Sequence, residues 1–303
     1  MNKAQWFQAL QEIFSNKVLT DEPMRRHTTW KIGGPADFMV FPASEAELQQ
    51  CLALLEQENM SRFIIGNGSN LLVGDKGIRG VVVKMGEPFS ESYWRDNQVE
   101  ACAGMLLSAL ALEAADRSLA GLEFSRGIPG SVGGAIRMNA GAYGNTIGEY
   151  VTEVEALTFG GEKKLLKKEQ ITFAYRDSSL YQFDGIITRV RFQLHPGDRE
   201  QILAKIKEFS QKRSFNQPLE FPSCGSVFRN PENDHAGRLI EMAHLRGVSI
   251  GGAAVSKKHG NFIINLGGAH AADVRALIEE VQQQVFEYSG IHLETEVKMV
   301  GEF

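Results

Sequence analysis

Phe63-Ile64-Ile65-Gly66-Asn67-Gly68-Ser69-Asn70 joins a short apolar run to a turn of glycine, asparagine and serine. The apolar run predicts a strand, and glycine at its exit allows positive φ and close approach of a ligand to the backbone. Successive amide N–H groups in such a turn can form a concave site for an anion such as a pyrophosphate. Position 71 is leucine, so the Gly-x-Gly-x-x-Gly fingerprint is not completed. A Rossmann-type NAD-dependent dehydrogenase is therefore disfavoured.

A second glycine-rich stretch follows at Gly127-Ile128-Pro129-Gly130-Ser131-Val132-Gly133-Gly134. The side chains of Ser69, Asn70 and Ser131 would add neutral hydrogen-bond donors to the same anion. Most glycine clusters are simply tight turns, and one alone would be weak evidence. Two clusters that carry serine or asparagine, and that lack the lysine of a Walker loop, favour a dinucleotide site.

The segments around these stretches predict an α+β fold, because strands and helices do not alternate strictly. Ser44 followed by Glu47 is a capping-box signature for the start of a helix. Further helices are expected at residues 4–14, 106–117, 200–215, 235–244 and 274–285. Strands are expected at residues 37–41, 63–65, 98–102, 151–159, 186–194, 261–265 and 296–300. Pro196-Gly197-Asp198 is a turn signal and marks the expected domain boundary.

Composition limits the class of protein. A chain of 303 residues predicts two or three domains, and its net charge of −5 argues against a broad electrostatic grip on nucleic acid. The three cysteines are widely spaced, which favours reduced thiols over a disulfide framework or a thiolate metal site. No apolar run approaches the roughly 20 residues that span a bilayer, so a cytoplasmic protein without membrane insertion is expected.

Six segments resemble the family of UDP-N-acetylenolpyruvoylglucosamine reductases, in the family's order. Residues 31–37, 66–73 and 127–144 resemble its FAD-binding half. Residues 175–178, 222–231 and 294–297 resemble its three active-site segments. The short chain looks like the second subtype, and Thr295 stands where the family usually carries proline.

The resemblance implies a vanillyl-alcohol-oxidase-type FAD-binding fold of two α+β subdomains plus a separate α+β substrate-binding domain. The expected ranges are an N-terminal helix at residues 1–20, an FAD-binding domain at 21–197 with subdomains at 21–90 and 91–197, and a substrate domain at 198–303. The residues expected to bind FAD are Gly66, Asn67, Gly68, Ser69, Asn70, Gly127, Ile128, Pro129, Gly130, Ser131, Gly133, Gly134, Asn139, Ala140 and Gly141.

The implied reaction is the NADPH-dependent reduction of UDP-N-acetylglucosamine enolpyruvate to UDP-N-acetylmuramate, in peptidoglycan precursor synthesis. The resemblance makes Arg176 the cation for the substrate carboxylate, Ser226 the proton donor and Glu296 a helper that polarises or relays. Outside the family context, Arg176 would be a surface arginine and Ser226 a turn residue. The residues expected near the substrate are Tyr175, Arg213, Arg229, Asn230, Lys257 and His259, although His259 more often has a structural role.

Two alternatives stay open from the residues alone. A flavin-dependent oxidase on the same scaffold would need no counterpart of Ser226 and Glu296. A non-catalytic nucleotide-binding module would use the glycine-rich turns only to hold its ligand. No carboxylate and histidine spacing suggests a metal site, and the oligomeric state is not readable from the sequence.

Overall fold

The computed structural model describes residues 1–15, 17–87 and 89–303, which form two compact units. The first unit contains Met1–Thr20, Phe38–Asn67 and Gly80–Gln211, and the second contains Asp21–Asp37, Gly68–Arg79 and Lys212–Phe303. Three strands pass from one unit into the other: β1 (Val18–Pro23), β2 (Pro35–Val40) and β5 (Ile78–Lys84). Packing therefore assigns two early segments to the same unit as the C-terminal residues. The expected functional domains, 1–20, 21–197 and 198–303, stay a prediction.

The first unit is built from long strands and the helices that cover them. Its helices are α1 (Lys3–Phe14), α2 (Glu45–Gln57), α3 (Leu107–Asp116), α4 (Val132–Arg137) and most of α5 (Arg199–Asn216). Its strands are β3 (Arg62–Ile65), β6 (Ser92–Arg95), β7 (Gln98–Cys102), β8 (Leu119–Ala120), β9 (Gly141–Ala142), β10 (Asn145–Thr146), β11 (Val151–Thr158), β12 (Lys163–Lys167), β13 (Phe173–Ala174), β14 (Asp177–Ser178), β15 (Gly185–Gln193) and β16 (His195–Pro196).

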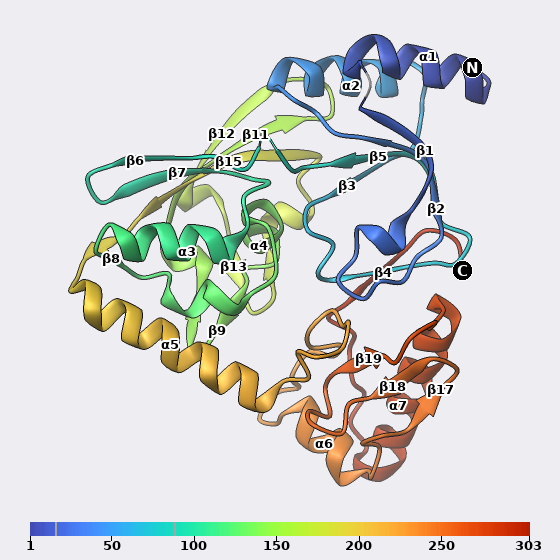
Figure 1. The fold of residues 1–303 in the computed structure, drawn as a ribbon, viewed down its shortest axis with the longest axis vertical. Helices are drawn as coiled ribbons and strands as arrows, with labels where there is room; N and C mark the ends of the chain where they lie inside the picture. Colours follow the sequence, from blue (N-terminus) through green and yellow to red (C-terminus); the bar gives the residue numbers. More distant parts are fainter. Residues whose placement is uncertain (16, 88) are drawn as a thin grey trace. The chain divides into compact units, whose positions relative to one another are not determined.

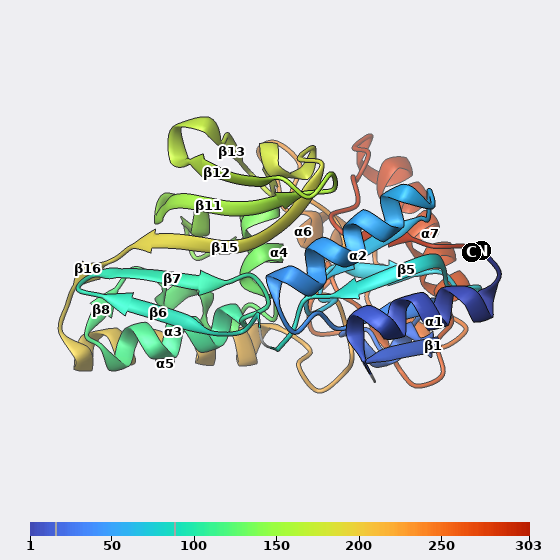
Figure 2. The ribbon, with the colours of Figure 1, turned by 90° about the horizontal axis from the view of Figure 1, so that it is seen from above.

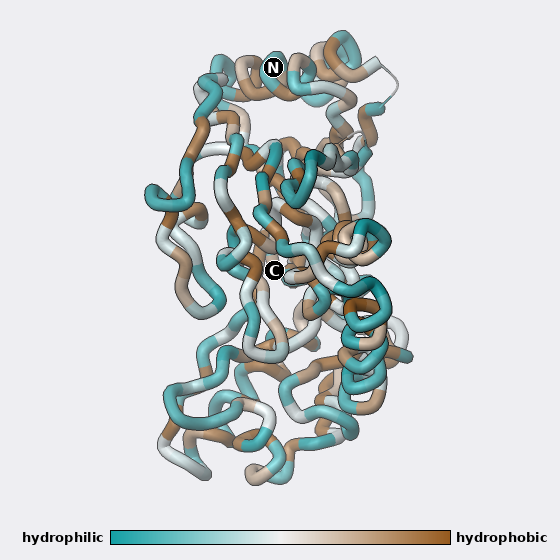
Figure 3. Tube along the Cα trace, turned by 90° about the vertical axis from the view of Figure 1, so that its left-hand side faces the viewer, coloured by the Kyte–Doolittle hydropathy of each residue, from teal (hydrophilic) through white to brown (hydrophobic). Residues whose placement is uncertain are grey.

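Two large apolar clusters contribute most to the packing of the first unit. One lies between α3, α4 and the inner face of a five-stranded sheet of order β12-β11-β15-β7-β6 (Figure 2). The other lies under α1 and α2, which run side by side in Figure 1 and mix hydrophobic with hydrophilic residues in Figure 3. The Ser44 hydroxyl accepts a hydrogen bond from the Glu47 amide at 3.1 Å and so caps α2, as the sequence predicts.

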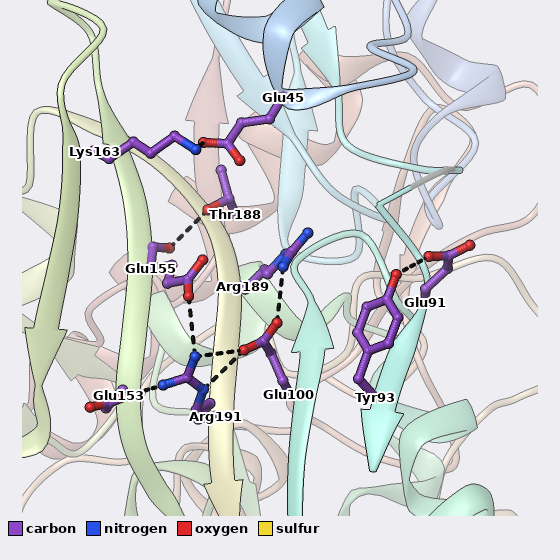
Figure 4. Close-up of polar contacts among 10 residues, drawn as sticks. All are labelled: Glu45, Glu91, Tyr93, Glu100, Glu153, Glu155, Lys163, Thr188, Arg189 and Arg191. Carbon is purple, nitrogen blue, oxygen red and sulfur yellow. Dashed lines mark hydrogen bonds and ion pairs between the residues drawn. The ribbon is translucent and has the colours of Figure 1, made fainter. Parts of the chain in front are cut away.

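The outer face of the five-stranded sheet carries a network of charges (Figure 4). Arg189 and Arg191 alternate along β15 with residues that point into the core, so both reach the opposite face. The Glu100 carboxylate accepts from Arg189 at 3.0 Å and from Arg191 at 2.9 Å. Arg191 also pairs with Glu153 and, at 3.5 Å, with Glu155. One guanidinium therefore links strands β7, β15 and β11.

The second unit packs short strands against two helices. Its elements are α6 (Ala236–Met242), α7 (Ala271–Ser289), β4 (Leu71–Val73), β17 (Ser249–Ile250), β18 (Ala253–Val255), β19 (Ile263–Asn265) and β20 (Lys298–Val300). Short 3₁₀ helices in the two units cover Met24–Arg26, Glu123–Gly127, Ile147–Glu149, Lys168–Gln170 and Ser179–Tyr181.

Trp30 anchors an early segment in the second unit. Its side chain is fully buried, its indole N–H donates to the carbonyl of Ile263 at 2.9 Å, and Asn265 donates to its backbone oxygen at 3.1 Å. Farther along, β20 pairs in parallel with β4, so the end of the chain joins the strand that follows the first glycine-rich turn. Residues distant in sequence thus form one core.

Most predicted elements are confirmed, including the apolar stripe of α7: Val274, Leu277, Ile278, Val281 and Val285 are all buried. The sequence did not predict β1, β4 or the β6 and β12 edges of the large sheet. Among residues 1–15, 17–87 and 89–303, no helix is both long and apolar enough to cross a bilayer.

The charge network gives a stability prediction. Arg191→Gln should lower the free energy of unfolding by about 1–2 kcal/mol at low salt, because three carboxylates lose a shared cation and exposed pairs contribute up to about 1 kcal/mol each. The loss should shrink in about 1 M salt, where the Debye length is about 3 Å. Urea denaturation measures both values. Arg199→Gln, which removes a single exposed pair with Asp116, is the control and should have a smaller effect. A salt-independent loss for Arg191→Gln would contradict the electrostatic explanation.

Candidate active site

The two glycine-rich stretches meet in the first unit. A Cβ on Gly66 would lie 2.0 Å from the hydroxyl oxygen of Ser131, so any other residue there would force the Ser131 side chain to move. The Asn67 side-chain amide donates to the carbonyl of Pro129 at 2.5 Å. The exit of β3 and the start of α4 are therefore held in contact, as a shared nucleotide site requires.

Backbone hydrogen bonds fix the second stretch. The Leu107 amide donates to the Gly130 carbonyl at 3.0 Å, and the Val132 amide donates to Met105 at 2.8 Å. The Gly133 amide donates to the Ala103 carbonyl at 2.9 Å, and Gly133 lines the cavity described below. Gly133 also allows close packing, because a Cβ would lie 2.9 Å from the Ala103 side chain. Gly133 therefore has a steric role in this packing, and its contact with a cofactor stays a prediction.

The first residues of the second glycine-rich stretch, Gly127 and Ile128, contact neighbouring protein segments. Gly127 ends a 3₁₀ helix, and the Ile128 amide donates to the Ser125 carbonyl at 2.9 Å. Ile128 is partly buried against the core beneath the sheet. These contacts set the path of the chain into Pro129, and any direct contact of Gly127 and Ile128 with a cofactor stays a prediction.

A small cavity adjoins the contact between the two stretches. Its lining is formed by Ile64, Gly66, Met85, Ala103, Ser131, Gly133, Gly134, Arg137, Gly185, Ile186 and Ile187. The volume is about 80 Å³, well below the roughly 300–1,000 Å³ of whole ligand pockets. The lining of glycine, apolar residues, one hydroxyl and one arginine suits one part of a flat or phosphorylated cofactor. Bare backbone where a Cβ would collide is what close approach of a dinucleotide requires.

Lys84 and Arg137 are two cationic side chains near this cavity, and neither belongs to a motif identified in the sequence. Lys84, the last residue of β5, donates from Nζ to the Gly66 carbonyl at 2.5 Å, and burial lowers its pKa to about 8. Arg137, in α4, donates to the carbonyls of Phe183 and Gly185 at 3.0 and 2.9 Å, and burial lowers its pKa. In the sequence, Lys84 directly follows the apolar run Val81–Val83, and that position could have pointed to it. The structure shows that the run is buried.

Arg176 lies in the tight turn between β13 and β14 with a positive φ of 53°. Its guanidinium donates to the Gly141 carbonyl at 3.0 Å and lies 5.2 Å from the ring centre of the exposed Tyr175. Asn139 supports the same turn: its side chain donates to the Ala174 carbonyl at 2.8 Å and accepts from the Gly148 amide at 3.1 Å. Asn139 and Gly141 therefore position the Arg176 turn.

The end of the first turn belongs to the second unit. Gly68 has a φ of +63°, and a Cβ there would lie 2.1 Å from the carbonyl oxygen of His27. Asn70 donates from its side chain to the Glu296 carbonyl at 3.0 Å, and its own carbonyl accepts from the Lys298 amide at 3.0 Å. Asn70 thus connects the turn to the third predicted active-site segment. For Ser69, the cofactor role stays a prediction.

The Ser226 segment is paired with the Glu296 segment in the second unit. The Glu296 amide donates to the Val227 carbonyl at 2.7 Å, and the Arg229 amide donates to the Glu294 carbonyl at 2.8 Å. The negative charge of Glu296 also contributes, after burial, to the raised pKa of the Cys224 thiol. Asn261 holds the other side of the segment, since it accepts from the Phe228 amide and donates to the Phe228 carbonyl. The Ser226 and Glu296 segments, which the sequence analysis identified separately, are therefore paired with each other.

The backbone amide of Thr295 donates neither of the two hydrogen bonds that pair its segment with the Ser226 segment. Phe228 and Thr295 form an isolated antiparallel bridge, and the hydrogen bonds that make it come from the amides of Arg229 and Glu296 on either side. The departure from the family's usual proline therefore leaves the backbone beside Glu296 intact.

A cavity of about 330 Å³ lies next to Ser226 in the second unit. It is lined by Ser226, Asn230, His235, Gly237, Arg238, Glu241, Arg246, His259, Gly260 and Asn261. The Asn230 side-chain oxygen accepts from the Ala236 amide at 3.1 Å at the start of α6. His259 accepts from the Asn261 amide at 3.2 Å, and burial, followed by the charge of Arg246, lowers its pKa. His259 is thus a neutral, structurally bonded ring at the cavity wall.

Two other predicted substrate residues, Lys257 and Arg213, do not line this cavity. The Lys257 side chain covers Gly247, where a Cβ would come within 3.1 Å of the lysine Cε. Arg213 lies in the last turns of α5, and its carbonyl accepts from the Gln217 amide at 2.9 Å. In the part of the chain that the structure describes, no group of three or more His, Cys, Asp or Glu side chains could hold a metal ion.

Comparison with known proteins agrees with this arrangement. Residues 36–164 match the FAD binding domain family, and residues 217–300 match the C-terminal domain of UDP-N-acetylenolpyruvoylglucosamine reductase. The reductase of Carboxydothermus hydrogenoformans is 46% identical over 302 residues, which cover 100% of both chains. That of Heliobacterium modesticaldum is 46% identical and covers 95% of this chain and 92% of its own.

Solved structures show the same fold. The UDP-N-acetylenolpyruvylglucosamine reductase of Thermus caldophilus has a TM-score of 0.81 at 35% identity, covering 93% of this chain and 98% of its own. An alkyldihydroxyacetonephosphate synthase has a TM-score of 0.50 at 16% identity over 65% of this chain and 41% of its own, a likeness of fold alone.

Fold and matches together define an FAD-dependent oxidoreductase of α+β class with a vanillyl-alcohol-oxidase-type FAD-binding fold. The chain belongs to the UDP-N-acetylenolpyruvoylglucosamine reductase family, and its FAD cofactor and its place in peptidoglycan precursor synthesis follow.

The contact at Gly66 gives a binding prediction. Gly66→Ala should weaken FAD binding about tenfold or more, because the methyl group moves Ser131 and occupies the bare backbone that the flavin would approach. Restoring the bound geometry would cost about 1–3 kcal/mol on binding, and 1.4 kcal/mol is tenfold in affinity. Flavin fluorescence titration of the apoprotein measures this. Gly160→Ala is the control, since its nearest heavy atom would be 3.8 Å away. Unchanged affinity in a folded Gly66→Ala protein would place the flavin elsewhere.

The bridge at Thr295 gives a second prediction. Thr295→Pro should change the free energy of unfolding by less than about 1 kcal/mol, because the substitution removes no hydrogen bond and restricts the unfolded chain. Chemical denaturation measures the change. A loss above about 3 kcal/mol, the cost of a misplaced proline, would show that the Thr295 amide or its φ is essential.

Proposed function

We propose that the protein reduces UDP-N-acetylglucosamine enolpyruvate to UDP-N-acetylmuramate with NADPH as the electron donor. The observation that supports this most is the backbone pairing of the Ser226 segment with the Glu296 segment, together with Asn261. An oxidase would have no use for a hydroxyl and a carboxyl group fixed on paired segments. When bound, FAD supplies the two-electron chemistry by accepting a hydride from NADPH and passing a hydride to the substrate.

Arg176 is proposed to bind the carboxylate of the enolpyruvyl group. Hydride addition to the terminal vinyl carbon leaves negative charge on the adjacent carbon and on that carboxylate. A preorganised cation stabilises this charge as it develops, and comparable polar donors contribute about 3–4 kcal/mol. The bond to the Gly141 carbonyl and the ring of Tyr175 restrict the guanidinium in advance. Arginine suits the task because it stays charged and can donate two parallel hydrogen bonds to a carboxylate.

Ser226 is proposed to donate the proton that completes the reduction at the adjacent carbon. A free serine is a weak acid, so donation needs a strongly basic acceptor and a supporting group. Glu296 is proposed as that support, which polarises the enolate region or relays the proton. The pairing of residues 226–229 with 294–297 keeps the two segments in a fixed register.

The UDP-sugar portion is proposed to use the second unit. Asn230 and His259 line the 330 Å³ cavity beside Ser226, and Arg238 and Arg246 lie in the same wall. Tyr175, Arg213 and Lys257 are proposed as further contacts with the substrate. The proposal also keeps the expected cytoplasmic location, where NADPH and nucleotide sugars are available.

Separate half-reactions test the proposed function. In Ser226→Ala, NADPH should still bleach the bound flavin without oxygen, because that step needs no substrate proton. Recovery of the oxidised spectrum on adding UDP-N-acetylglucosamine enolpyruvate should slow about 10²–10⁴-fold, the usual contribution of a general acid. Anaerobic stopped-flow absorbance follows both steps.

Ser249→Ala provides the control, since Ser249 lies exposed in β17. Equal loss of both half-reactions in Ser226→Ala would remove the proton-donor role. Failure of the enolpyruvyl sugar to reoxidise the wild-type flavin would overturn the proposed reaction.

A further inference from the structure

Lys84 ends a buried strand with a cation. The preceding residues, Val81, Val82 and Val83, are fully buried, and Lys84 itself is partly buried opposite Ile65 of β3. Its ammonium donates to the carbonyl of Gly66, the first residue of the glycine-rich turn. A charged side chain is therefore directed at the turn in which Gly66 approaches Ser131 and the Asn67 side chain bonds Pro129.

The surroundings of Lys84 supply no compensating negative charge in the described residues. Burial is the cause that lowers its pKa to about 8, and no carboxylate opposes that shift. On β3, the charged residue is Arg62, which is paired with Glu56. On β2, Asp37 is paired with Arg79 of β5.

The other ionisable groups around the cavity do not neutralise Lys84 either. Arg137 lines the cavity as a second cation and donates to backbone carbonyls. Cys102, at the end of β7, is a buried thiol whose pKa is raised chiefly by burial. Glu91 accepts from the Tyr93 hydroxyl, and Glu87 is exposed after β5. A partly buried cation without a counter-ion among the described residues costs free energy, which an anionic ligand would recover.

We propose that Lys84 is the cationic partner of the FAD pyrophosphate and holds the Gly66 turn in its ligand-binding conformation. The proposal rests on the FAD cofactor and on the location of its site at the two glycine-rich stretches. The ammonium acts in two ways: its hydrogen bond orients the Gly66 carbonyl, and its charge offsets the charge of the phosphates. Lys84 is thus a binding and positioning residue, which no motif of the sequence indicated.

A protonation linkage follows from this role. The pKa of Lys84 near 8 belongs to the protein without ligand, and an adjacent anion raises it in the complex. FAD affinity is therefore at its full value below about pH 8. It falls as the pH rises above that value, by up to about tenfold per pH unit for one linked proton. Binding above pH 8 takes up a proton.

The test is the dissociation constant of FAD for the apoprotein across pH 7–9.5, measured by flavin fluorescence. The wild type should lose affinity above about pH 8. Lys84→Arg stays charged throughout and should show no such slope, while Lys84→Met should bind about 10- to 100-fold more weakly at pH 7 and also lose the slope. Lys168→Met is the matched control, because Lys168 donates to the Glu149 carbonyl at 2.7 Å from an exposed position and should keep the wild-type slope.

Calorimetry of the unmodified protein makes the test independent of folding defects in the variants. Titration of FAD at pH 8.5 in two buffers of different ionisation heat should show uptake of between half and one proton. A wild type without proton uptake, or a Lys84→Arg protein that keeps the wild-type slope, would overturn the role of Lys84 alone. A wild type that binds no FAD at any pH would overturn the location of the flavin site as well.

Discussion

The approach of Gly66 to Ser131 is the contact on which the first unit's site depends. Where a side chain would begin, the hydroxyl of the second stretch already stands 2.0 Å away, and Asn67 adds a hydrogen bond to Pro129. Strand β3 and helix α4 are thereby joined at their ends, and both stretches border one cavity. In the proposed flavin site, this junction would present bare backbone to the dinucleotide on two sides. Lys84 and Arg137 set the charge beside it.

A different interaction organises the second unit. Antiparallel pairing of residues 226–229 with 294–297, with Asn261 on the other side, fixes a serine segment against a carboxylate segment. Asn70 extends this arrangement to the end of the first glycine-rich turn through the Glu296 carbonyl. The same asparagine therefore serves a turn predicted to bind cofactor and a segment predicted to act on substrate. Parallel pairing of β20 with β4 stabilises that connection.

Local signals in the sequence account for much of this structure. The cap at Ser44, the stripe of α7 and the two glycine-rich stretches are readable because each depends on neighbours in the chain. Strand β1 was not predicted, since Asp21, Glu22 and Pro23 give it no strand pattern. Pairing in a separate four-stranded sheet of order β1-β2-β5-β3 creates it. The division into units and the roles of Lys84, Asn139 and Gly133 depend on contacts between distant residues. Asn139, for example, donates to the Ala174 carbonyl and accepts from the Gly148 amide.

Hydrogen–deuterium exchange of the apoprotein with and without FAD examines the junction itself. If the two stretches form the flavin site, added FAD should slow exchange in residues 64–68 and 129–135 together, with smaller changes on the charged outer face of the sheet. Protection of only one stretch, or protection confined to the outer strands β11 and β12, would contradict a shared site.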